Sequence, residues 1–293
     1  MASAPSHLTA VAANLLREPN AHRIEAILSE RWVAYPRAKH VLAVLEHLVF
    51  HPRMTRMPSL AIYGDSGMGK TMILQRFSSN HPPSFDPKAG VRQTPVLALQ
   101  MIGRPSERRF FAQLLAAAGA PPSARCDIVD LEQTALRVLR AIGVKVLVLD
   151  EVHNILAGPQ RDQRVILNLL RFISNELRIS LVCFGIAEAR EAISGDVQLA
   201  RRIDEMRLDR WAANEEFETL VALILRNLPL RNPSVLNART LRRILQLTDG
   251  VSARIFRMLN ELAIEAIETS AEEITDDSVE RWRPVVERQA AFA

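Results

Sequence analysis

Cysteine is scarce in this sequence, and long apolar runs are absent from it. The chain has 293 residues and two cysteines, Cys126 and Cys183, which lie too far apart for a zinc-binding pair and are expected to be reduced, packed thiols. No segment approaches the roughly 20 apolar residues that cross a membrane, and the first residues lack the basic stretch and apolar core of a secretory signal. These absences predict a cytosolic protein without a membrane partner.

Internal repeats and low-complexity tracts are also missing, and the composition is that of an ordinary globular chain. Hydrophobic residues make up 48% and charged residues 24% of the sequence, which argues against disorder. The formal net charge of +4 permits contact with nucleic acid but does not establish it. This length accommodates two domains, or one α/β domain with a helical annex.

One glycine-rich stretch, residues 64–71, fits the phosphate-loop pattern G-x-x-x-x-G-K-[ST] without a gap. It lies between a short apolar strand at 59–63 and the start of a helix at 72, the context that phosphate binding requires. Backbone N–H groups and the helix N-terminus would hold the phosphates, with Lys70 at the β- and γ-phosphates and Thr71 on Mg²⁺. The alternative is a glycine-rich turn that matches by chance. The predicted nucleotide-binding residues here are Gly64, Asp65, Ser66, Gly67, Met68, Gly69, Lys70 and Thr71.

A second informative stretch, residues 144–151, ends in two carboxylates. An aliphatic run leads into Asp150 and Glu151, so both acids are expected at the C-terminal end of a buried strand, where open α/β sheets bind ligands. We assign Mg²⁺ ligation through its water shell to Asp150 and polarisation of the attacking water to Glu151. A solvated strand end is the alternative.

The remaining periodicity predicts strands alternating with helices, followed by helices alone. Such alternation implies right-handed crossovers and a parallel sheet. Ser106 has the chemistry of an N-cap. Beyond Trp211 the strands stop. The other expected elements are strands at 95–100 and 179–184, a proline-rich loop at 81–88, and helices at 110–118, 131–142, 163–177, 217–228, 241–247 and 253–267, with a short one after Asp276.

The predicted fold class is therefore α/β: a phosphate-loop parallel sheet flanked by helices, followed by a smaller all-helical lid. The expected domains are an N-terminal helical extension at 1–57, a nucleotide-binding domain at 58–212 and a lid at 213–293. Residues 1–20 are expected to be loosely attached. Helical spacing from Ile24 to about Phe50, broken at Pro36, predicts two further helices. These pack either beside the nucleotide base or as a simple extension of the core.

The phosphate loop, the acidic strand end and the trailing helical domain together resemble the AAA+ ATPases. Three runs are similar to the TniB/TnsC family, the ATP-dependent regulators of heteromeric DNA transposons: RWVAYP at 31–36, LDEVHN at 149–154 and QLARRI at 198–203. The resemblance covers most of the chain. It implies a slow, assembly-dependent ATPase that uses ATP and Mg²⁺ and oligomerises on duplex DNA as a ring or helical filament. It further implies a bacterial cytosolic protein that marks the target, recruits the transposase with a TniQ-like targeting adaptor, and is reset by hydrolysis.

The resemblance also implies roles for individual arginines. The family's trans-acting arginine finger falls on Arg202, with Arg201 left open as its neighbour, and a surface arginine is the alternative. Arg254 opens a lid helix as the AAA+ sensor arginine does, with Arg257 as the other candidate. The chain departs from the family at Cys183, where a polar residue commonly senses the γ-phosphate, and this departure favours slow turnover.

DNA contacts are expected from the loop at 103–109. Its Arg104, Arg108 and Arg109 would pair with phosphates and would not read bases, and no recognition-helix signature is present. A solvated helix start is the alternative. Two rival functions stay open: a helicase-loader-like or clamp-loader-like remodeller of a protein partner, and a signalling NTPase switch. Salt-sensitive, ATP-dependent binding to random duplex DNA separates the transposition regulator from both.

Overall fold

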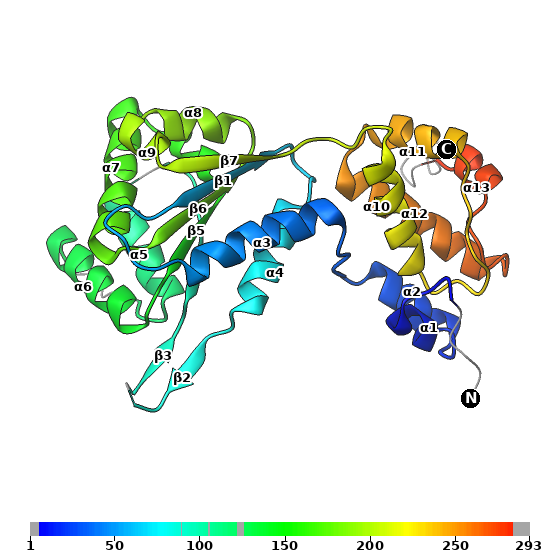
Figure 1. The fold of residues 1–293 in the computed structure, drawn as a ribbon, viewed down its shortest axis with the longest axis horizontal. Helices are drawn as coiled ribbons and strands as arrows, with labels where there is room; N and C mark the ends of the chain where they lie inside the picture. Colours follow the sequence, from blue (N-terminus) through cyan, green and yellow to red (C-terminus); the bar gives the residue numbers. More distant parts are fainter. Residues whose placement is uncertain (1–5, 89, 105, 122–125, 284–293) are drawn as a thin grey trace. The chain divides into compact units, whose positions relative to one another are not determined.

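The computed structural model describes residues 6–88, 90–104, 106–121 and 126–283, which form two compact units (Figure 1). Unit 1 comprises Met1–Lys39, Gly67–Gly69 and Arg210–Ala293, and unit 2 comprises His40–Ser66 and Lys70–Asp209. Unit 2 contains the main sheet, whereas the described elements of unit 1 are helices. Within the described ranges, no helix is both long and apolar enough to span a membrane.

Unit 2 is built on a five-stranded parallel sheet in the order β4-β5-β6-β1-β7 (Figure 1). Strand β1 pairs with β6 on one side and with the edge strand β7 on the other, so that Leu60 lies opposite Val182 and Asp204. Parallel pairing brings the carboxyl ends of all five strands to one edge. The strands are β1 Ser59–Gly64, β4 Val96–Gln100, β5 Val146–Asp150, β6 Ser180–Gly185 and β7 Ile203–Leu208.

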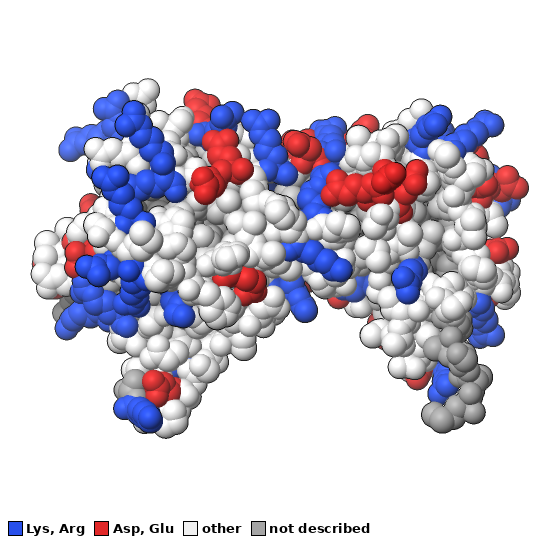
Figure 2. Space-filling view, viewed as in Figure 1, with Lys and Arg blue, Asp and Glu red and all other residues white. Residues whose placement is uncertain are grey.

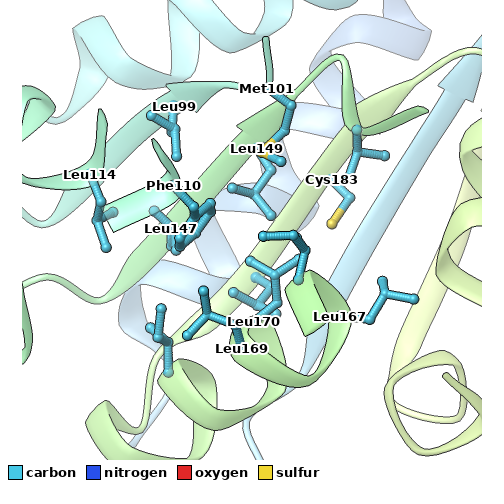
Figure 3. Close-up of a cluster of buried hydrophobic side chains, with 14 of the residues drawn as sticks. Leu99, Met101, Phe110, Leu114, Leu147, Leu149, Leu167, Leu169, Leu170 and Cys183 are labelled. Atoms are coloured by element: carbon cyan, nitrogen blue, oxygen red, sulfur yellow. The ribbon is translucent and has the colours of Figure 1, made fainter. Parts of the chain in front are cut away.

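Strands β1, β5 and β6 are buried on both faces, because helices cover both faces of the sheet. On one face, α5 (Glu107–Ala117), α6 (Ile128–Ala141) and α7 (Gln160–Leu177) enclose a core with alternate strand residues such as Leu147, Leu149 and Cys183 (Figure 3). The neighbouring strand residues Val148 and Val182 are buried on the other face, where α3 (Pro36–Phe50) and α4 (Lys70–Asn80) lie. The predicted parallel sheet with flanking helices is confirmed.

Two features of unit 2 differ from the sequence-based expectation. The stretch at 81–88 is not all loop, because β2 (Ser84–Asp86) pairs antiparallel with β3 (Val91–Gln93). The edge strand β7 is not predicted, because only Ile203 and Leu208 of its six residues are buried, which leaves no continuous apolar run. The connections also contain η1 (Val152–Ala157), α8 (Glu188–Ser194) and α9 (Val197–Ala200).

Unit 1 is a helical bundle in which α12 contacts α2, α10 and α11. Asn214 and Asn237 accept backbone hydrogen bonds at the starts of α10 and α11, as N-caps do; Ser106, by contrast, occupies the N-cap position of α5 without a side-chain hydrogen bond. The predicted trailing helices are confirmed. The helices of this unit are α1 (Ala10–Leu15), α2 (Asn20–Leu28), α10 (Glu215–Arg226), α11 (Ala238–Thr248), α12 (Ser252–Glu268) and α13 (Asp276–Arg281).

The N-terminal segment is fastened to this bundle. The backbone N–H of Thr9 donates to the Arg226 carbonyl oxygen at 2.9 Å, and a ring nitrogen of His7 lies 3.2 Å from the Leu230 carbonyl oxygen. The expectation of a loosely attached stretch is therefore wrong from residue 7 onward, since small and polar residues here satisfy backbone groups of α10 and the loop after it.

Candidate nucleotide site

The predicted phosphate loop lies at the carboxyl end of β1, between that strand and α4. Gly64 passes so close to β7 that a Cβ there would lie 2.7 Å from the Leu208 carbonyl oxygen, so a larger residue would displace the strand. Gly69 has a φ of +90°, which L-residues with side chains rarely adopt. The loop thus has the curled backbone that directs N–H groups at an anion.

Lys70 is held inside this loop as the first residue of α4. Its side chain is almost buried, and Nζ donates to the carbonyl oxygens of Gly64 at 2.6 Å and Asp65 at 2.9 Å. Burial lowers the pKa of Lys70, although the carboxylates of Glu151, Asp150 and Asp65 raise it. The ammonium is therefore confined to the loop. The nearby carboxylates offset its positive charge only in part, which suits an anionic ligand.

Asp150 ends β5 at the same edge of the sheet. Burial raises its pKa, while the backbone N–H of Glu151, 2.9 Å from Asp150 Oδ1, lowers it. Its carboxylate and the exposed Thr71 hydroxyl are the hard oxygen ligands that Mg²⁺ prefers. Residues in the described ranges form no group of three or more His, Cys, Asp or Glu that would hold a metal ion. These two side chains fit Mg²⁺ whose remaining ligands are phosphate oxygens and water.

Glu151 lies beyond the strand. Its φ of 55° and ψ of 40° are left-handed, a conformation uncommon for a residue with a side chain. The Glu151 carboxylate raises the pKa of Lys70, as a negative charge near an ammonium does. Its Oε2 lies 3.2 Å from Nε2 of His153. The expectation that both acids end the strand therefore holds for Asp150, and Glu151 turns at the start of η1.

The neighbouring strand β6 ends in buried apolar groups. Cys183, Phe184 and Gly185 are all buried, and burial raises the pKa of the Cys183 thiol to about 12, so the thiol stays protonated. The polar side chain next to this strand end comes instead from His153, which sequence reasoning missed. This histidine is part of the LDEVHN run, but the sequence alone does not reveal which residues lie beside it in the fold.

Arg201 and Arg202 lie at the opposite edge of the sheet. They follow α9 and immediately precede β7, whose first residue Ile203 pairs with Ser59 at the amino end of β1. Six residues of β1 separate this edge from the phosphate loop, a span on the order of 17 Å. Arg201 is exposed, and Arg202 Nη1 donates to Asn175 Oδ1 of α7 at 2.7 Å. Within one chain, Arg202 and Lys70 are thus kept apart.

The two candidate sensor arginines belong to unit 1. Arg254 forms an ion pair with Asp249 just before α12, and Arg257 pairs with Glu261 one turn further along that helix at 2.8 Å. Both side chains are more than half exposed. Each has a carboxylate partner within its own unit, so geometry does not distinguish them.

The three arginines proposed for DNA contact are exposed and lie between β4 and α5 or in the first turn of α5. Arg104 donates to Asp162 of α7 at 2.9 Å, which joins this loop to the start of α7. Arg108 donates to the Cys126 carbonyl oxygen at 2.7 Å, and Arg109 approaches that of Ile102 at 3.5 Å.

The start of α7 adds positive charge beside this loop. It carries the exposed Arg161 and Arg164, which the sequence reasoning did not single out because only the Arg104–Asp162 contact brings them near residues 103–109. On the face shown in Figure 2, Lys and Arg side chains gather over α6 and α7.

Comparison with known proteins identifies the family and the fold of this chain. The model of the family described as bacterial TniB protein matches residues 23–213, well over half of the chain. Among curated proteins, none matches the sequence. Solved structures share the fold at low identity. The Aeropyrum pernix ORC1 protein in complex with DNA is 18% identical, with a TM-score of 0.57 over 88% of this chain and 67% of that one.

Two further solved structures agree. Cdc6p from Pyrobaculum aerophilum is 16% identical, with a TM-score of 0.60 over 85% of this chain and 68% of that one. The ADP form of the Aeropyrum pernix ORC2 protein is 17% identical, with a TM-score of 0.58 over 87% and 70%. At these identities the likeness establishes the AAA+ fold alone. The family is established by the match of its model, and the chain belongs to the TniB family.

Proposed function

We propose that this protein is an ATPase that assembles on duplex DNA in its ATP state and regulates transposition. The observation that carries the ATPase proposal is the meeting of Lys70, Asp150 and Glu151 at one edge of the sheet. Structures of the Aeropyrum pernix ORC2 protein with ADP and ADPNP support an adenine nucleotide as the ligand. The family supports the role in transposition.

The residues of one chain would supply most of a hydrolytic arrangement. Residues 64–71 would bind the phosphates through backbone N–H groups, and Lys70 would bind the β- and γ-phosphates. Thr71 and Asp150 would hold Mg²⁺, which neutralises charge developing on the phosphates when bound. Glu151 would take the proton of the attacking water, because its carboxylate is only partly exposed and its charge acts on Lys70 in the phosphate loop.

Assembly would complete the site. Arg202 lies at the amino edge of the sheet and the phosphate loop at the carboxyl edge, so a head-to-tail contact would bring one subunit's arginine to its neighbour's nucleotide. Such heterologous contacts generate rings or helical filaments. Hydrolysis would then depend on assembly, and its completion would reset the complex. Arg254 would report nucleotide state from unit 1.

Contact with DNA would use the arginines at the joined starts of α5 and α7. Arg104, Arg108 and Arg109, with Arg161 and Arg164 beside them, would neutralise backbone phosphates without reading sequence. The ORC1 structure contains DNA, which supports this class of partner. A transposase and a TniQ-like adaptor would bind the assembled form.

Sedimentation with random duplex DNA tests the proposal. Large complexes are expected with a non-hydrolysable ATP analogue, and ADP should dissolve them. Replacing Arg104, Arg108 and Arg109 by Ala should weaken DNA binding and flatten its dependence on salt by about 0.9 in log–log slope for each phosphate that is no longer neutralised. A matched control replaces three exposed arginines of unit 1, Arg231, Arg239 and Arg242.

Each other outcome overturns part of the proposal. Large assemblies that ignore DNA favour a remodeller of a protein partner. A monomer that retains nucleotide in every state favours a switch. If the arginine variant and its control lose equal amounts of DNA affinity, the loop at 103–109 is not part of the DNA-binding surface.

A further inference from the structure

His153 lies beside Glu151 at the carboxyl edge of the sheet. Its Nε2 is 3.2 Å from Glu151 Oε2, and the ring is only 20% exposed. Both residues belong to the short turn that follows β5, and this turn is fixed from its other end. The Asn154 backbone N–H donates to the Glu151 carbonyl oxygen at 2.9 Å, and Asn154 Nδ2 donates to the Met101 carbonyl oxygen at 2.8 Å. The backbone around Glu151 is thus anchored, and the imidazole lies beside its side chain.

The ring lies next to the end of β6. A Cβ at Gly185, the last residue of β6, would lie 2.5 Å from the Ala189 Cβ, so α8 excludes a side chain there. The same point lies 3.6 Å from Nδ1 of His153. The strand therefore supplies no polar side chain at this position, and the imidazole from the adjacent turn is a neighbouring polar group.

The surroundings of the ring select one tautomer. Nδ1 is buried and has no hydrogen-bond partner among the residues that the structure describes. A proton there would bury an N–H without an acceptor, whereas a bare Nδ1 leaves only a lone pair unsatisfied. The remaining proton then sits on Nε2, the ring nitrogen that lies 3.2 Å from Glu151 Oε2. A neutral ring beside the carboxylate leaves the negative charge that a general base needs.

We propose that His153 is a positioning residue for Glu151: the neutral imidazole lies against the carboxylate and restricts it to the orientation that activates water. The proposal rests on ATP hydrolysis through Glu151 as set out above. Two features of Glu151 make such positioning necessary. Its left-handed backbone directs the side chain along an uncommon path, and that side chain is partly exposed. Without the imidazole, the carboxylate would divide its time among other rotamers.

Steady-state kinetics of ATP hydrolysis on DNA test this role. His153→Ala should lower kcat about tenfold, less than the 10²–10⁴-fold of removing a general base, with ATP affinity unchanged. His153→Gln should restore most of kcat, because its amide N–H can donate to the same carboxylate. His81→Ala is the matched control, since His81 pairs with Glu46 at 2.6 Å elsewhere in unit 2, and it should leave kcat unchanged.

Contrary outcomes are distinct. Wild-type kcat in His153→Ala overturns the proposal while leaving the ATPase intact. A loss of ATP affinity as large as the loss of kcat in His153→Ala indicates a purely structural role and also overturns the proposal. The same conclusion follows if His153→Gln does not recover kcat. Absence of hydrolysis by the wild-type protein overturns both this proposal and the proposed function.

A spectroscopic measurement on the ligand-free protein is independent of activity. Long-range ¹H–¹⁵N correlation of the histidine rings distinguishes the two neutral tautomers and the imidazolium. The signals of His153, assigned by their loss in His153→Gln, should have the proton on Nε2 and none on Nδ1. A protonated Nδ1 would contradict the proposal.

Discussion

Arg202 donates a hydrogen bond to Asn175 at 2.7 Å, at the amino edge of the sheet whose carboxyl edge carries Lys70. The contact fixes the guanidinium between the end of α9 and α7. Because the length of β1 separates it from its own phosphate loop, the arginine can serve a nucleotide only in a neighbouring subunit. The fold therefore makes a trans role for Arg202 a question that mixing experiments can decide.

Arg202→Ala should lack DNA-dependent ATPase activity alone and regain some when mixed with Glu151→Gln. In the mixture, an Arg202→Ala subunit keeps its own Glu151 and receives the arginine of its partner. In a random 1:1 mixture roughly a quarter of the interfaces have this arrangement, so about that fraction of wild-type activity is expected. Arg201→Ala, tested in the same way, is the control. No recovery where mixed oligomers are seen to form would refute the trans role.

Glu151→Gln should bind ATP but hydrolyse it about 10²–10⁴ times more slowly, because an amide cannot take the proton of the attacking water. ATP-dependent complexes on DNA should then persist, as measured by sedimentation over time. Glu176→Gln is the matched control, since Glu176 forms a half-exposed pair with Arg140 away from the site. Hydrolysis at the wild-type rate in Glu151→Gln would remove this residue from catalysis.

Lys70→Ala should weaken ATP binding about tenfold or more, because hydrogen bonds from a charged donor contribute about 1.5–3 kcal/mol each. Titration with a fluorescent ATP analogue measures the loss. Lys145→Ala, which removes an exposed lysine of unit 2, should bind normally. Unchanged affinity in Lys70→Ala, with the fold intact by circular dichroism, would refute the phosphate-loop assignment.

Much of the site was predictable because its signals are local. The glycine spacing of residues 64–71 and the apolar run into Asp150 each specify a short segment, and parallel pairing then brings both to one edge. Three of the four predicted strands, β1, β5 and β6, are buried on both faces, and the fourth, β4, has an almost continuous apolar run. The edge strand β7 was missed because Asp204, Glu205 and Arg207 are exposed on it.

What the sequence could not supply are contacts between segments. The roles of His153 and Arg161 depend on which turn lies beside which, and a histidine or arginine alone has no spacing that reveals its neighbour. The left-handed backbone of Glu151 is also invisible, because nothing in the residue type requires it. The buried ion pair of Arg23 with Glu272 joins positions 249 residues apart, beyond any local pattern.

That ion pair leads to a prediction about stability. Arg23 is fully buried, and its guanidinium donates to Glu272 at 2.8 Å and to the Pro229 carbonyl oxygen. Arg23→Ala should destabilise unit 1 by about 3–5 kcal/mol, because it removes the buried partner of a mostly buried carboxylate and leaves that carboxylate with the more exposed Arg231. Urea unfolding followed by tryptophan fluorescence measures this, since all three tryptophans lie in unit 1. Arg231→Ala removes the more exposed partner of Glu272 and should lower the free energy of unfolding by about 1 kcal/mol or less.

Glu272 should also make the stability of unit 1 depend on acid. Burial raises the pKa of Glu272, but hydrogen bonds from Arg23 and Arg231 outweigh it, so the pKa lies below its ordinary value of 4.5. A carboxyl whose pKa is lowered by folding stabilises the protein above its unfolded pKa, and this contribution is lost as pH falls through the folded value. Unfolding free energies of wild type and Glu272→Gln should therefore differ most above pH 4.5 and converge as the pH is lowered further. A difference that stays constant down to strongly acidic pH would show that the charge of Glu272 contributes nothing and that the effect of the substitution is steric.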